Sequence, residues 1–143
     1  MYPFLKNSHN QIGMLVLFLL LVVILSLLVL FLLKKSFGRV PKVLALLGLI
    51  VVHLQILVGV VLYFLSPLGV NSFSGSSMKH AISRFYMAEH PVGMILAAVL
   101  ITIGYKQAKN AQLVSAKNYK RVLVYYTLGF ALIIYLIAWF LWS

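Results

Sequence analysis

The chain has 143 residues, of which 64% are apolar and 9% are charged. Soluble domains are about 45–50% apolar and about 25% charged, so this composition predicts a membrane protein. The net charge of +11 does not indicate nucleic-acid binding, because the Lys and Arg residues lie between long apolar runs. The sequence contains no cysteine and one acidic residue, Glu89, which excludes disulfides, Cys-ligated clusters, c-type haem attachment and mechanisms that need paired carboxylates.

The first predicted span covers residues 12–33 and follows a short polar lead, residues 1–10. About 20 apolar residues in a helix cross the ~30 Å hydrocarbon core of a bilayer, so this run is long enough. It lacks the cleavage site of a signal peptide, and we therefore expect it to remain as a span. In the basic turn that follows, residues 34–42, Gly38 and Pro41 are expected to break the helix.

The second predicted span, residues 43–66, carries His53 near its middle and Gln55 two residues further on. A polar group at that depth costs free energy unless it has a partner. An ionisable residue there is therefore a candidate functional site.

The rest of the chain predicts two more spans. A mixed polar and apolar pattern over residues 77–88 predicts a surface helix, or the start of a long third helix, with a kink at Pro91. The third span covers residues 85–105 and the fourth covers residues 122–142. Tyr and Trp residues near the ends of the fourth span are typical of a membrane interface.

Basic residues are distributed unequally between the two sides of the predicted bundle. Nine lie in the first and third connections and three on the other side. The nine are Lys34, Lys35, Arg39, Lys42, Lys106, Lys109, Lys117, Lys120 and Arg121, and the three are Lys6, Lys79 and Arg84. By the positive-inside rule both termini face away from the cytoplasm. We expect an all-α, polytopic membrane protein, a single domain over residues 1–143 that forms an up-down four-helix bundle in the bacterial inner membrane.

The four histidines differ in predicted depth. Counted along each helix from its cytoplasmic end, His53 lies about 15 Å and His90 about 22 Å into the membrane. Helix tilt and a kink at Pro91 could absorb the offset of about 7 Å. His9 and His80 form a second, outer pair near the membrane surface.

Two imidazoles from facing helices in a bilayer are what a b-type haem needs as axial ligands. Small residues nearby could leave room for a flat macrocycle, although they also serve ordinary close packing of membrane helices. These residues are Gly48, Gly59, Gly93, Ala97 and Ala98. The alternative for His53 is a histidine bonded across the bundle to Gln55, a tyrosine or a backbone carbonyl. The alternative for His90 is an interfacial polar residue.

Four blocks of sequence also resemble a known family. They are Tyr2…Leu5…His9, the segment VHLQILVGVVLYFLSP (residues 52–67), the segment MKHAISRFYMAEHP (residues 78–91) and ITIGY (residues 101–105). Their content and order resemble the small four-helix "cytochrome B" proteins common in Bacteroidetes.

The resemblance implies that His9, His53 and His90 fall on the histidines of the family. It also places Arg84 and Glu89 on the polar pair of the family, whereas His80 is peculiar to this sequence. The chain departs from the family pattern at residues 12–14 and residues 139–143, where a Leu-Arg-aromatic motif and a Trp-Pro-Phe end are replaced.

We therefore expect a membrane-embedded b-type cytochrome that carries electrons between quinone or quinol and a partner protein, as a subunit of a quinone-linked oxidoreductase. His53 and His90 are the expected ligands of one haem b, and Met94, one turn below His90, is the alternative to His90. Glu89 could accept a hydrogen bond from His90 or His9, and Arg84 could pair with a haem propionate or anchor the interface. His9 and His80 could bind a second haem or a metal ion, or flank a quinone pocket.

Two other classes of function are open to such a chain. A haem-free structural subunit of a larger inner-membrane complex is the alternative, because one acid and no extramembrane domain leave little machinery for acting alone. A transporter or channel is disfavoured, because the first and fourth spans carry almost no polar groups.

Overall fold

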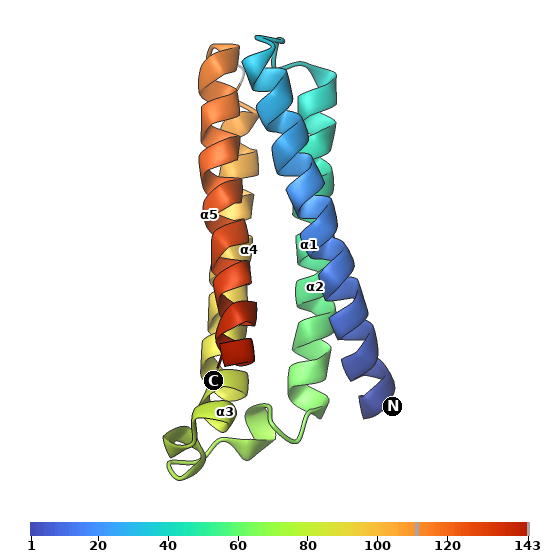
Figure 1. Ribbon diagram of the computed structural model, residues 1–143, viewed down its shortest axis with the longest axis vertical. Helices are drawn as coiled ribbons and strands as arrows, with labels where there is room; N and C mark the ends of the chain where they lie inside the picture. The colour runs from blue at the N-terminus through green and yellow to red at the C-terminus, as the bar shows by residue number, and fades with distance from the viewer. Residues whose placement is uncertain (111, 143) are drawn as a thin grey trace.

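The structure is a computed structural model that describes residues 1–110 and 112–142 of the chain. Four long helices run along one axis: α1 (Tyr2–Leu32), α2 (Arg39–Leu65), α4 (His90–Ala108) and α5 (Ser115–Trp142) (Figure 1). The short elements η1 (Val70–Ser72), η2 (Ser77–Lys79), α3 (Ala81–Arg84) and the π-helix η3 (Phe85–Glu89) connect α2 to α4.

Within residues 1–110 and 112–142, four segments are long and apolar enough to cross a membrane: Tyr2–Leu32, Arg39–Ser72, Ala81–Ala108 and Ser115–Trp139. The predicted all-α architecture with four candidate spans is confirmed. Both termini lie at one end of the bundle, and the α1–α2 and α4–α5 connections lie at the other (Figure 1). Helices α1 and α4 each pack mainly against α2 and α5, so α1 and α4 stand diagonally across the bundle.

The helices extend further than the apolar runs. Helix α1 begins at Tyr2, with a proline in its first turn, so the polar lead is helical and His9 lies on α1. Pro41 likewise stands in the first turn of α2 rather than breaking a helix. Proline is tolerated there because the first N–H groups of a helix have no internal acceptor.

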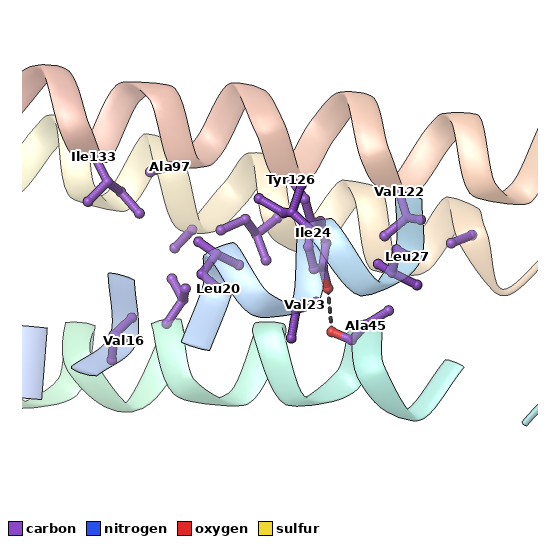
Figure 2. Packing of buried hydrophobic residues seen from close by; sticks show 14 of the residues in the cluster. Val16, Leu20, Val23, Ile24, Leu27, Ala45, Ala97, Val122, Tyr126 and Ile133 are labelled. Atoms are coloured by element: carbon purple, nitrogen blue, oxygen red, sulfur yellow. Dashed lines mark hydrogen bonds between the residues drawn. The ribbon is translucent and has the colours of Figure 1, made fainter. Parts of the chain in front are cut away.

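The core is built from side chains of all four long helices, seen at close range in Figure 2. Tyr126 of α5 is fully buried and donates its hydroxyl to the carbonyl of Ala45 on α2. A Cβ on Gly48 would lie 2.9 Å from the Tyr126 ring, and one on Gly104 would lie 3.1 Å from it. These two glycines therefore make room for the buried tyrosine.

Outside this core, large apolar side chains such as Phe18, Leu57 and Val92 are exposed along the helices. An apolar outer surface of this kind suits contact with lipid tails, which are themselves apolar.

Candidate functional site

The structure brings His9 and His90 together. Their ring centroids are 6.3 Å apart and their planes are 77° apart, so the two imidazoles meet edge to face. Both side chains are half-buried, and they come from the diagonal helices α1 and α4. The sequence predicts His80 as the partner of His9, and His53 as the partner of His90.

Gln55 of α2 completes a cluster with them. Its amide nitrogen donates to the backbone carbonyl of His9 at 2.7 Å and lies 3.2 Å from His9 Nδ1, which can accept the second N–H. The amide oxygen Oε1 is buried, and within residues 1–110 and 112–139 it meets no hydrogen-bond donor. We call His9, Gln55 and His90 the polar cluster.

Two glycines give the polar cluster its space. A Cβ on Gly13 would lie 2.9 Å from the amide nitrogen of Gln55, and one on Gly59 would lie 3.1 Å from Cε1 of His9. Residues with side chains at these positions would push Gln55 and His9 away from each other.

Aromatic side chains form a wall beside the polar cluster. The Phe85 ring is 5.5 Å from the His90 ring, and it stacks on Trp139 of α5 at 4.8 Å with an angle of 17°. Phe85 is buried, so this side of the cluster is closed to water.

The backbone hydrogen bonding just before His90 is determined by Pro91. Proline has no N–H, and the carbonyl that its N–H would meet in an α-helix is that of Met87. Tyr63 of α2 donates its hydroxyl to this carbonyl at 2.9 Å. A tyrosine from a neighbouring helix thus replaces the missing backbone donor, as membrane helices that contain proline require.

The π-helix η3 lies just before Pro91, where the sequence predicted a kink. The predicted surface helix over residues 77–88 is broken into η2, the short helix α3 and η3.

Arg84 and Glu89 form an ion pair across η3, with 2.6 Å between Nε and Oε1. Residues five apart do not face each other on an α-helix, but the wider turn of a π-helix brings them together. The carboxylate expected behind His90 or His9 is thus held by Arg84. Both side chains remain more than one third exposed.

His53 lies in a different layer of the bundle. Its Nδ1 is 2.8 Å from the carbonyl of Leu49, and its Nε2 is 3.2 Å from the hydroxyl oxygen of Thr102 on α4. The Leu49 carbonyl can only accept, and the one hydroxyl proton of Thr102 is donated to the carbonyl of Ala98 at 2.7 Å, so both neighbours of the His53 ring face it as acceptors. The side chain of His53 is otherwise exposed.

The structure does not bring His53 next to His90. Thr102 follows His90 by twelve residues, which is about 18 Å along a helix. Side chains on a helix lean toward its N-terminus, and α2 and α4 run in opposite directions. The two imidazoles therefore lean away from each other, which counting residues along the backbone does not take into account.

Most of the small residues expected to admit a macrocycle serve packing instead. A Cβ on Gly93 would lie 2.5 Å from a methyl group of Leu136, and Ala97 and Ala98 are buried in the core. Of this set, Gly59 is the one in contact with the polar cluster. His80 is exposed and stands at the start of α3. In the described part of the chain, no three metal-binding side chains come together.

Several residues of the site had no clear signal in the sequence. Thr102 and Tyr63 are single hydroxyl groups within apolar runs, and Trp139 resembled an interfacial anchor. The sequence signal for Gln55 was its depth, but its partner His9 was expected outside the helix.

The chain matches no protein-family model, no curated protein and no solved structure. Its resemblance to the "cytochrome B" proteins remains a prediction.

Proposed function

We propose that the protein is a membrane-embedded electron carrier that holds one haem b between His9 of α1 and His90 of α4. It would pass electrons between quinone or quinol and a partner membrane subunit. The observation that carries the proposal is the spacing of the two imidazole rings, 6.3 Å between centroids.

The distance between the two rings suits two ligands of one metal ion, and a ring rotation out of the edge-to-face arrangement would point both nitrogens at it. Metal–nitrogen bonds to imidazole are about 2.0 Å long, so a metal ion held between the two rings would be within reach of both His9 and His90. His9 and His90 would hold haem b, which would supply one-electron chemistry when bound. The proposed ligand pair is His9 and His90, in place of the His53 and His90 pair expected from the sequence.

Gln55 would orient His9 for this role. Its amide engages Nδ1 and leaves Nε2 as the free nitrogen of the ring. Turning the amide over would bring Oε1 to the Nδ1–H of a ligating His9, a bond that orients an imidazole, and Gln55 would have to shift because Oε1 would otherwise meet the His9 carbonyl oxygen. Phe85 and Trp139 would exclude water from one side.

The site would lie near the non-cytoplasmic surface of the bacterial inner membrane. The polar cluster includes residues from the start of α1 and the start of α4, at the end of the bundle where both termini lie (Figure 1). The nine basic residues of the two connections at the other end favour a cytoplasmic location for that end. Arg84, at the same end as the cluster, could pair with a haem propionate if it exchanged its bond to Glu89.

A reduced-minus-oxidised spectrum of the purified full chain tests the proposal. The wild type should show a low-spin haem b signal, which His9→Ala and His90→Ala should each abolish. His53→Ala and His80→Ala are the matched controls and should keep it. A signal lost in His53→Ala but kept in His9→Ala would overturn the ligand assignment.

The second candidate is a haem-free structural subunit of a membrane complex. It is favoured by the observation that His9 and His53 already have protein partners, Gln55 and Thr102. A wild-type protein without a haem signal, expressed where haem is plentiful, would support this candidate and reject the first.

A further inference from the structure

A groove lies between the start of α2 and the end of α4, at the end of the bundle away from the termini. Its volume is about 360 Å³. Three cationic side chains line it, together with three side chains that present apolar surface. The cations are Arg39, Lys42 and Lys109, and the others are Val43, Leu46 and Tyr105. We call this cavity the α2–α4 groove.

The positive charge of the groove has no acidic partner in the protein. The one acidic side chain of the sequence, Glu89, precedes α4, whereas Lys109 follows the end of α4. Glu89 is moreover paired with Arg84. Like charges that line one cavity repel each other unless an anion joins them.

Two further features direct this charge into the groove. The Nζ of Lys109 lies over the Tyr105 ring, 4.5 Å from its centroid, which holds the ammonium group at the wall. Gly38, which also lines the groove, is the N-cap of α2 and offers no side-chain cap to the first N–H groups of the helix. These N–H groups form the positive end of the helix dipole.

The apolar part of the groove indicates what kind of anion would fit. Val43 and Leu46 are 46% and 36% exposed and follow Lys42 along α2, toward the middle of the span. A ligand that satisfies both parts carries an anionic head and an apolar tail. Basic pockets between membrane helices bind phospholipid head groups in this way.

We propose that the α2–α4 groove binds an anionic phospholipid of the adjoining leaflet. Its phosphate lies among Arg39, Lys42 and Lys109, and an acyl chain lies along Val43 and Leu46. Inorganic phosphate would contact only the three cationic side chains and not the apolar part of the groove.

Native mass spectrometry of the full chain, released from detergent with phosphatidylglycerol or phosphatidylcholine, tests the proposal. Phosphatidylglycerol should stay bound to the wild type and phosphatidylcholine should not. The triple variant Arg39→Gln, Lys42→Gln, Lys109→Gln should lose roughly tenfold or more of the phosphatidylglycerol adduct.

The matched control is Lys117→Gln, Lys120→Gln, Arg121→Gln. It removes one arginine and two lysines from exposed positions of α5 outside the groove, and it should keep the adduct. Val43→Trp leaves all three cations but fills the apolar part, so it should also weaken the adduct. Helix content by circular dichroism shows that each variant is folded.

Three results would overturn the proposal. They are equal loss of adduct in the two triple variants, equal retention of the two lipids, and displacement of phosphatidylglycerol by millimolar inorganic phosphate. The last would show that the groove binds the phosphate group alone.

Discussion

The hydroxyl of Tyr63 lies 2.9 Å from the carbonyl oxygen of Met87, the oxygen that Pro91 leaves without its helical donor. In water such an oxygen would be solvated. In a bilayer it needs a donor from the protein, and Tyr63 supplies it from the neighbouring helix α2. The backbone that leads into His90 therefore depends on a side chain 24 residues earlier in the chain.

Replacement of this tyrosine should cost more than replacement of a deeper one. Tyr63→Phe leaves the Met87 carbonyl without a hydrogen-bond donor and should lower the free energy of unfolding by about 1–3 kcal/mol. Tyr126→Phe should cost about 0.5–1.5 kcal/mol, because the Ala45 carbonyl lies within α2 and keeps its helical N–H partner. Unfolding in mixed micelles, followed by circular dichroism, measures both.

A second variant separates the backbone effect from simple loss of packing. In a Pro91→Ala background the substituted residue carries an N–H, so the cost of Tyr63→Phe should shrink. An unchanged cost would mean that Tyr63 stabilises the bundle through its ring rather than through Met87.

The bond between His53 and Thr102 should be a modest interhelical contact. A double-mutant cycle of His53→Ala and Thr102→Val should give a coupling energy of about 0.6 kcal/mol, and no more than about 1.7 kcal/mol. Thr102→Val preserves shape and removes the hydroxyl. A coupling energy of zero would show that the ring proton of His53 goes to the Leu49 carbonyl and not to Thr102.

Gly104 should not tolerate a methyl group. A Cβ there would lie 2.7 Å from the Cβ of Tyr125, an atom fixed to the α5 backbone, so Gly104→Ala should force α4 and α5 apart at a cost of about 1–3 kcal/mol. Gly75→Ala is the control, because nothing lies within 4 Å of the added atom. Equal unfolding free energies for the two variants would show that the α4–α5 contact is looser than described.

The charge distribution makes a prediction about topology. A phosphatase reporter fused to the C-terminus should be active, and one fused after Gln112 should be inactive, because the second site lies at the basic end. Fluorescent-protein fusions at the two sites should give the opposite pattern. A cytoplasmic C-terminus would invert the orientation proposed for the polar cluster.

The number of candidate spans was predictable because a run of about 20 apolar residues in a protein is typical of a membrane-spanning helix and of little else. The helix ends were not, since backbone hydrogen bonding carries α1 back through polar residues to Tyr2, beyond the apolar run. Polarity of side chains indicates where the membrane begins, not where the helix does.

The histidine pairing could not be predicted from depth alone. These helices are apolar on nearly every side, so the sequence does not reveal which face of α1 or α4 points inward. The lean of each side chain toward its own helix N-terminus moves His53 toward Thr102 and His90 toward His9. The presence of candidate ligands was evident from the sequence, whereas their partners depend on helix rotation.

The π-helix η3 is a joint between α4 and the segment before it. Deleting or inserting one residue in η3 would change the direction in which that segment leaves α4. Removing Ala88 would convert it to an α-helical turn in which the residues of the Arg84–Glu89 pair stand four apart and still meet. Everything before the joint, including η2 and the polar loop, would swing by about 100° and advance by about 1.5 Å. His90 would keep its place on α4. One insertion or deletion would thus re-aim the outer loop over the polar cluster, and it would also shift Phe85 from Trp139 and Met87 from Tyr63.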